Sequence, residues 1–340
     1  MEKFTDFIPQ NVATVGAEKI GVYNASGVKL CQIELGNLAL PSNKGNKLYS
    51  FGALSDVHIS QETAEEDFSR AMSFFQDTEN VDFVCIAGDL THYNEDAEWE
   101  QYANCVDNYS VPVYPIGGNH DAYGSGLTDA RFQQYTGHGT FYIFTQGNDV
   151  FIMLSSGAWP SKSGGVQPFY TAGLQALYEA LETNRNKRCF VFQHYFPWGH
   201  AGDPMELYGS NSAFWGSQGQ VIYSMMEHYK NSLWFHGHSH HMFECQSIHE
   251  KSNYDFDFGC HDIHIPSCAL PVQVSASGTR TQLVEGSQGY VVDVYENGIH
   301  LRGRDFVKGE FLPIASYWLN TTLQTIEAGT YTDSTGTVTT

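Results

Sequence analysis

The 340-residue chain carries 38 acidic and 17 basic side chains, which gives a formal net charge of −21. We do not expect such an acidic protein to bind long nucleic acid or an anionic membrane surface, because both require Lys and Arg to neutralise phosphate. Hydrophobic residues make up 41% of the chain and aromatic residues 14%, which argues against disorder. A length of 340 residues is enough for one large α/β domain or two smaller ones.

Composition divides the chain into three segments. Residues 1–47 are polar and turn-rich with strand-like pieces, residues 48–312 form the expected main domain, and residues 313–340 end in a Thr- and Gly-rich tail that we expect to be partly exposed. There is no signal-peptide pattern and no apolar run long enough to cross a bilayer. The seven cysteines form no CxxC pair, so we expect reduced thiols and a cytoplasmic protein with no membrane contact.

Strands and helices alternate in the first part of the main domain. The apolar runs that predict strands are Leu48–His58, Val81–Ala87 and Val111–Ile116, and the helices between them are expected at Thr63–Gln76 and Asp96–Asp107. This alternation is typical of stacked βαβ units with a parallel sheet.

A hairpin opens the second part, because Gly147-Asn148-Asp149 is a turn sequence between the strand-like runs Phe141–Thr145 and Val150–Ser155. The elements that follow are expected at Ala172–Asn184 (helix), Arg188–Gln193 (strand), Gln218–Lys230 (helix) and Leu233–His236 (strand). Three runs then predict a closing β-meander at Gln288–Tyr295, Gly298–Gly303 and Arg304–Phe311.

Five of these strands are followed by Asp, Asn or His at the carboxyl end, where ligands bind in α/β sheets. The residues are Asp56 and His58, Asp89, Asn119 and His120, His194, and His238 and His240. The spacing of two residues in Asp56-x-His58 and in His238-x-His240 places each pair on one face of an extended chain. Oxygen and nitrogen donors without thiolate suit Mn, Fe or Zn, and seven donors suit two ions that share a carboxylate. His236 precedes the last motif and is expected to be buried and hydrogen-bonded.

The ordered set of motifs resembles the calcineurin-like metallophosphoesterases, whose pattern is D-x-H, GD, GNH[DE], a single His and GHxH. The resemblance covers about residues 48–305 and implies an α/β fold, a four-layer sandwich of two mixed β-sheets flanked by helices. Its implied ligands for the first of two divalent ions are Asp56, His58 and His240. Those for the second are Asn119, His194 and His238, with Asp89 bridging both.

The resemblance also implies a metal-bridging hydroxide as nucleophile and His120 as proton donor or charge stabiliser. In many members an Asp three positions after the bridging Asp orients the catalytic His, but this chain has His92 there. We therefore include His92 and the adjacent Asp121 as further candidates for the catalytic site. The purple acid phosphatase branch has a metal-binding Tyr at that position. Tyr93 lies one residue too far, so we do not expect that variant.

The resemblance, together with an aromatic loop, favours a metal-dependent phosphodiesterase that acts on a small, nucleotide-like phosphorylated substrate, most similar to the cyclic-nucleotide phosphodiesterase branch of the family. Phosphomonoesterase or nucleotide pyrophosphatase activity at the same site is the alternative, and a non-catalytic scaffold is the alternative of another class. Aromatic residues in the loop 195–217, namely Tyr208, Phe214 and Trp215, either stack on a substrate ring or pack within their own loop. Tyr123 is another candidate for the rim of the site.

Overall fold

The computed structural model describes residues 40–124, 126–156, 169, 171–205, 216–256 and 259–329, together with short strands at 12–14, 19–23, 29–34, 331–332 and 338–339. The aromatic residues Tyr208, Phe214 and Trp215 lie outside the described residues. No helix in the described part of the chain is long and apolar enough to cross a membrane. Six cysteines are buried and form no disulfide bond: Cys85, Cys105, Cys189, Cys245, Cys260 and Cys268.

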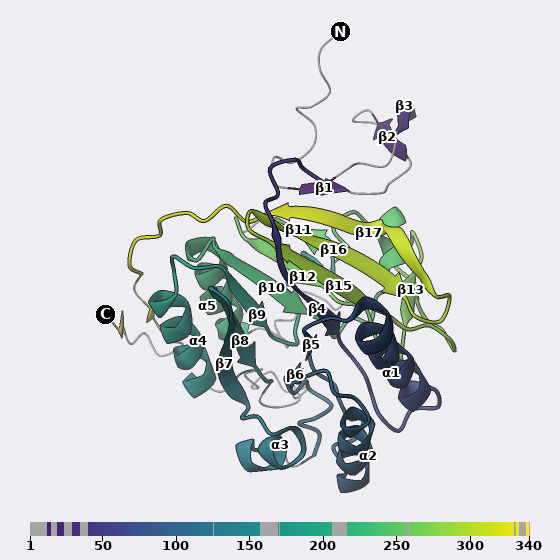
Figure 1. The fold of residues 1–340 in the computed structure, drawn as a ribbon, viewed down its shortest axis with the longest axis vertical. Coiled ribbons are helices and arrows are strands. Elements are labelled where there is room, and N and C mark those ends of the chain that lie inside the picture. The colour runs from purple at the N-terminus through teal and green to yellow at the C-terminus, as the bar shows by residue number, and fades with distance from the viewer. Residues whose placement is uncertain are drawn as a thin grey trace.

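Two large sheets form the centre of the molecule (Figure 1). The seven-stranded sheet has the order β1 (Val12–Thr14), β17 (Glu310–Asn320), β16 (Gly298–Asp305), β15 (Gln288–Tyr295), β4 (Lys47–Leu54), β5 (Phe83–Ile86) and β6 (Val113–Pro115). Its β4, β5 and β6 are parallel, and the remaining pairs are antiparallel. The sheet is therefore mixed, as expected.

The six-stranded sheet is mixed in the same way. Its order is β11 (Tyr254–Asp255), β12 (His261–His264), β10 (Ser232–His236), β9 (Cys189–Phe192), β8 (Asp149–Leu154) and β7 (Phe141–Gln146). The strands β12, β10, β9 and β8 are parallel, and β7 and β8 form the predicted hairpin. The smaller pairs are β2 (Lys19–Tyr23) with β3 (Lys29–Glu34), β13 (Val272–Val274) with β14 (Arg280–Gln282), and β18 (Tyr331–Thr332) with β19 (Val338–Thr339).

Helices cover the outer face of each sheet, which confirms the four-layer sandwich. On the seven-stranded sheet these are α1 (Ala64–Ser73), continued by the π-helix η2 (Phe74–Glu79), α2 (Asp96–Asp107) and α3 (Asp129–Thr136). On the six-stranded sheet they are α4 (Thr171–Thr183) and α5 (Gly216–His228). A short 3-10 helix, η3 (Phe243–Ser247), follows the last motif. Figure 1 shows α4 and α5 on one side of the sheets and α1 and α2 on the other, with α3 at the bottom.

An aromatic core joins the two sheets. Phe51 and Phe83 of the first sheet stack on each other, and Phe51 meets Phe151 and Phe190 of the second sheet edge-on. All four side chains are at most 3% exposed. Burial of each large apolar side chain contributes about 1.5–3 kcal/mol, so this layer fixes one sheet against the other.

Two sequence expectations differ from the structure. The sequence did not predict α3, because Phe132 is its only buried residue and no apolar stripe marks it; Thr128 at its N-cap and Gly137 at its C-cap define it instead. The predicted strand Arg304–Phe311 was wrong: β16 extends to Asp305, a turn through Gly309 (φ 70°) follows, and β17 begins at Glu310. The expected segment boundary at residue 312 falls inside β17, and β1 pairs with that same strand.

Candidate metal centre

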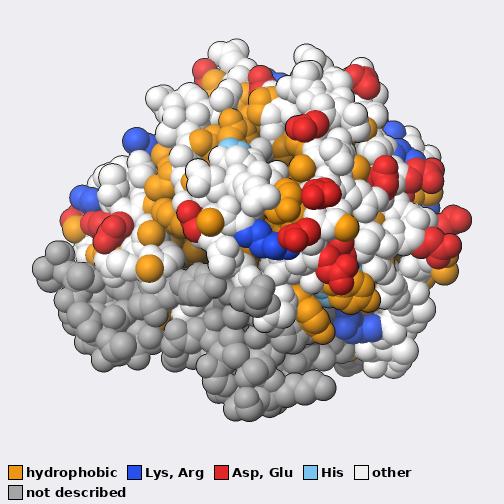
Figure 2. Space-filling model, turned by 90° about the horizontal axis from the view of Figure 1, so that it is seen from below, with side chains coloured by type: hydrophobic (Ala, Val, Ile, Leu, Met, Phe, Trp, Pro, Cys, Tyr) orange, Lys and Arg blue, Asp and Glu red, His pale blue; other side chains and the backbone are white. Residues whose placement is uncertain are grey.

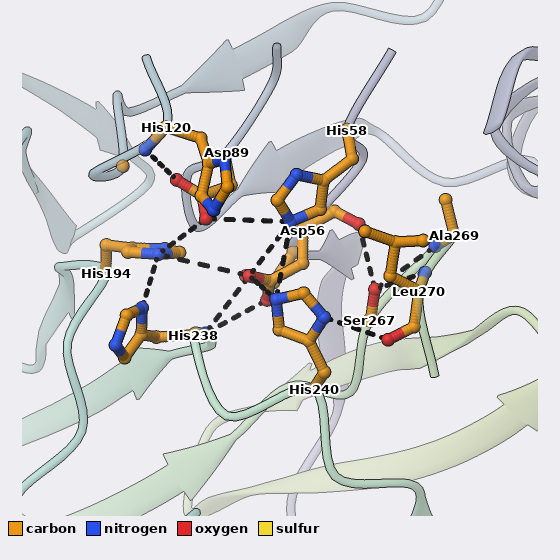
Figure 3. A network of polar contacts seen from close by, with 12 residues as sticks. Asp56, His58, Asp89, His120, His194, His238, His240, Ser267, Ala269 and Leu270 are labelled. Atoms are coloured by element: carbon orange, nitrogen blue, oxygen red, sulfur yellow. Dashed lines mark hydrogen bonds and ion pairs between the residues drawn. The ribbon is translucent and has the colours of Figure 1, made fainter. Parts of the chain in front are cut away.

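The seven candidate ligands converge at one edge of the sandwich. Asp56 and His58 follow β4, Asp89 follows β5 and Asn119 follows β6, whereas His194 follows β9 and the pair His238 and His240 follows β10. Because all five strands are parallel within their sheets and the sheets lie face to face, their carboxyl ends open onto the same space (Figure 3). The sites predicted from separate motifs therefore meet through tertiary packing.

Six of the seven side chains form two overlapping groups, and within each group the ligand atoms lie within 4.8 Å of one another. The first group contains Asp56, His58, Asp89 and His240, and the second contains Asp89, His194 and His238. Asp89 belongs to both, as expected for a bridging carboxylate. Its Oδ2 lies 3.2 Å from His194 Nε2 and 3.6 Å from His58 Nε2.

Backbone carbonyls fix the orientation of two of these imidazoles. His194 Nδ1–H donates to the carbonyl of Ala87 (2.7 Å), and His240 Nδ1–H donates to that of Leu270 (2.8 Å). A histidine held at one ring nitrogen presents the other, here Nε2, to an ion. Nε2 of His240 lies 3.1 Å from Asp56 Oδ1, so both imidazoles aim inward at the carboxylates.

The residues present fit divalent cations. Asp89 Oδ2 and Asn119 Oδ1 are buried and accept no hydrogen bond from the protein. Leaving buried oxygen acceptors unpaired is costly, whereas a cation satisfies them. The donors are carboxylate and amide oxygens and imidazole nitrogens, with no thiolate, which is unlike a structural zinc site. Together with the shared Asp89, this supports a dinuclear divalent metal site.

Burial and the neighbouring charges shift the pKa values of these groups in opposite directions. Burial opposes the charged form of His194, but Asp89 and then Asp56 outweigh it and raise its pKa to about 9. Burial likewise would lower the pKa of His240, yet Asp56 raises it above the ordinary value. Burial would raise the pKa of Asp56, and His240 and His194 reverse this so that it is lowered. Cations and protons thus compete for the same lone pairs.

The backbone around the ligands is unusual. Five of the seven have positive φ angles, namely Asp56 (54°), His58 (48°), Asp89 (52°), His238 (70°) and His240 (62°). Left-handed backbone is uncommon for residues other than Gly and often marks functional sites. Two motif glycines permit close approach: a Cβ at Gly237 would collide with Ser55 and Asp56, and one at Gly118 would collide with Asp89.

The structure also places the three candidate catalytic residues. The Nδ1–H of His120 donates to the carbonyl oxygen of His92 (2.7 Å), and the backbone N–H of His120 donates to Asp89 Oδ1 (2.8 Å). Asp121 is fully buried and accepts hydrogen bonds from the backbone N–H groups of Leu90, Thr91 and Gly118. Asp121 therefore braces the two loops that carry Asp89 and Asn119, and the His120 ring is held by a backbone carbonyl instead.

Sequence reasoning missed the segment from Ser267 to Leu270. Ser267 Oγ donates to the carbonyl of Asp56 (3.0 Å) and accepts from the backbone N–H of Leu270 (2.8 Å), whose carbonyl holds His240. This segment acts mainly through backbone atoms, so no residue pattern could have revealed it. His236, expected to be buried and hydrogen-bonded, is fully buried with its Nε2 3.0 Å from Asp262 Oδ1, which confirms that prediction.

Comparisons with known proteins identify relatives in sequence and in fold. A probable cyclic nucleotide phosphodiesterase of Colwellia psychrerythraea is 23% identical over 194 residues, which cover 54% of this chain and 69% of that protein. Among solved structures, GAP50, the anchor in the inner membrane complex of Plasmodium, matches with a TM-score of 0.56 and 14% identity over 83% of this chain and 91% of that one.

The purple acid phosphatase PPD1 of yellow lupin (Lupinus luteus) gives a TM-score of 0.49 and 13% identity over 82% of this chain and 54% of its own. The profile of the calcineurin-like phosphoesterases matches residues 49–242, more than half of the chain. With its motifs assembled into one two-ion centre, the chain belongs to the calcineurin-like phosphoesterase family.

Proposed function

We propose that this protein hydrolyses phosphodiester bonds in a small, nucleotide-like substrate. The observation that carries the proposal is the pair of ligand groups sharing Asp89, with His120 held beside them. When bound, two divalent cations would acidify a water molecule and neutralise the charge of a phosphoryl group.

His120 is the proposed acid in this reaction. Its ring lies 4.6 Å from the ring of His58, measured between centroids, and its backbone is bonded to Asp89. Because Nδ1–H is engaged by the His92 carbonyl, Nε2 is the ring atom that would protonate or stabilise the leaving oxygen. Mutual placement of a charge-stabilising centre and an acid is what ester hydrolysis requires.

Two tyrosines beside His120 support a substrate with a planar group. Tyr123 is 45% exposed and its ring is nearly parallel to that of His120 at 6.3 Å, and Tyr93 is 53% exposed and lies 6.4 Å from Tyr123. Asn94 Nδ2 donates to the carbonyl of Tyr123 and so ties the two loops together. Exposed aromatic faces stack well on a nucleobase.

The surface favours a small substrate over a long polyanion. Figure 2 shows acidic side chains spread over the face seen from below, with basic side chains in small separate groups, so the described residues of this face form no continuous basic stripe. The name of the Colwellia relative, a probable cyclic nucleotide phosphodiesterase, points in the same direction.

A reconstitution experiment tests the proposal. Metal-stripped protein is loaded with Mn, Fe(II) or Zn and assayed on bis-p-nitrophenyl phosphate, p-nitrophenyl phosphate, 3′,5′-cyclic AMP and a dinucleoside pyrophosphate. We expect the diesters to be turned over with the highest kcat/KM. A preference for the monoester or the pyrophosphate contradicts the diester assignment. Two bound ions with no turnover of any ester would favour the scaffold role instead.

A further inference from the structure

His92 lies between a metal ligand and the proposed acid. Its carbonyl oxygen accepts a hydrogen bond from His120 Nδ1–H, and its own Nδ1 lies 3.1 Å from Nδ1 of His58. The rings of His92 and His120 lie 4.8 Å apart between centroids, but the hydrogen bond that holds His120 is made by the backbone carbonyl of His92, unlike the side-chain contact of the Asp at this position in many family members. The His92 imidazole contacts Nδ1 of His58, which belongs to the first ligand group.

Whether His58 or His92 donates in this contact depends on which ring nitrogen of His58 carries the proton. His58 Nε2 faces the centre, 3.6 Å from Asp89 Oδ2 and 3.3 Å from His240 Nε2. A neutral imidazole that offers the Nε2 lone pair to a cation carries its single proton on Nδ1. That proton must find an acceptor in a site where His58 is fully buried, and His92 Nδ1 is within hydrogen-bond distance.

We propose that His92 is a positioning residue whose Nδ1 accepts the hydrogen bond from His58 Nδ1–H and thereby fixes the ring that holds the first ion. The inference rests on the two-ion site of the proposed function. It deepens that function by assigning the residue that departs from the family pattern. Through its carbonyl and its side chain, this one residue would orient both a ligand and the acid.

The same three rings offer a competing arrangement, because nitrogen atoms of His58, His92 and His120 lie close enough together to hold an ion themselves. The hydrogen bond from His120 Nδ1–H to the His92 carbonyl commits that nitrogen as a donor, so in this arrangement His120 would have to bind the ion through Nε2. The two arrangements differ in the number of ions bound, which can be measured.

Two substitutions distinguish the effect of a hydrogen-bond acceptor at residue 92 from the effect of side-chain volume. His92→Asn can place its amide oxygen near the position of Nδ1, whereas His92→Leu keeps volume but has no acceptor. His228→Leu, on α5, is the control. Each full-length protein is stripped with a chelator, checked for its fold by circular dichroism, and titrated calorimetrically with Mn²⁺. The Co²⁺ absorption spectrum of each loaded protein reports ligand geometry independently of activity.

We expect His92→Leu to weaken one of the two Mn²⁺ sites about 10- to 100-fold and to alter the Co²⁺ spectrum, with His92→Asn restoring most of the affinity and His228→Leu changing neither. Unchanged Mn²⁺ affinities in His92→Leu overturn the proposal. So does equal weakening in Leu and Asn variants, or a third ion that disappears with His92. Binding is measured without substrate, so an inactive wild-type enzyme that binds two ions would refute the proposed function and leave this inference intact.

Discussion

The two edges of the sandwich solve the burial of charge in opposite ways. At the carboxyl ends of β4 and β9 lies the metal centre, where Asp89 Oδ2 and Asn119 Oδ1 are buried and accept no hydrogen bond from the protein. At the amino ends of the same strands, Arg188 makes two bonds to Asp149 (2.6 and 3.0 Å), and Tyr49 donates to Asp149 as well (2.6 Å). We call the trio Tyr49, Asp149 and Arg188 the far-edge cluster.

The far-edge cluster is complete without a ligand. The remaining guanidinium donor of Arg188, Nη1, bonds to the carbonyl of Tyr295 and the hydroxyl of Thr321. Arg188 and Asp149 are 5% and 6% exposed, and none of the polar atoms of the cluster is buried without a partner. A buried polar cluster that satisfies itself contributes to structure, whereas one that leaves oxygens open is prepared for a cation.

The largest expected effect is catalytic and belongs to the metal edge. His120→Ala should lower kcat on a diester by about 10²- to 10⁴-fold, because the acid is removed while the ligand groups stay in place. Elemental analysis should still find two ions per chain. Turnover that survives this substitution, or ions that are lost together with His120, would contradict the role of His120 as an acid outside the ligand groups.

The second effect belongs to the far edge. Arg188→Leu leaves the Asp149 carboxylate buried without its cation, and the free energy of unfolding should fall by about 3–5 kcal/mol in urea denaturation. Any protein that remains folded should bind Mn²⁺ with the wild-type stoichiometry. A loss of Mn²⁺ binding without a loss of stability would show that the two edges are not independent.

Part of the loss of folding stability at acid pH should come from His261, away from the metal centre. His261, buried between Tyr254 and the carbonyl of Asn320, has a pKa lowered to about 4 by burial. The unfolded chain therefore binds a proton that the folded one resists, and stability falls as pH drops from about 6.5 to 4, by about 3 kcal/mol.

His261→Gln should keep a donor for the carbonyl of Asn320 but remove the group that takes up a proton on unfolding. Its urea midpoint should therefore decline less steeply between pH 7 and pH 4. Parallel declines in wild type and variant would assign the acid sensitivity elsewhere. Among the described residues, the hydrogen bonds of His261 go to Tyr254 and Asn320 and not to a candidate metal ligand. The measurement can therefore be made on metal-stripped protein.

The smallest effect is metal linkage. At an Mn²⁺ concentration 100 times the dissociation constant, the wild-type free energy of unfolding should rise by about 2.7 kcal/mol. Asp89→Asn should abolish this rise, because the shared carboxylate is gone. Asp149→Asn should lower stability without Mn²⁺ yet keep the rise. An Asp89→Asn variant that is stabilised as strongly as wild type would remove Asp89 from the centre.

Much of this centre could be predicted because each ligand sits in a short motif after an apolar strand. Asp56 and His58 after β4, and His238 and His240 after β10, were identified from the ordered set of motifs and its resemblance to the family pattern. The bracing role of Asp121 and the contact between His92 and His58 were not, since they depend on where loops from different strands meet. The third strand of the meander was misplaced because its turn at Gly309 is weakly marked in sequence.

The sequence by itself determined the strand-helix alternation, the ligand types and the order in which they occur, because apolar periodicity and donor chemistry are local properties. Only the tertiary structure decided that the carbonyls of Ala87 and Leu270 set the histidine tautomers, and that Arg188 meets Asp149 at the other edge. These contacts join residues far apart in the chain. Their geometry is set by the packing of the two sheets through the aromatic core, which no local pattern encodes.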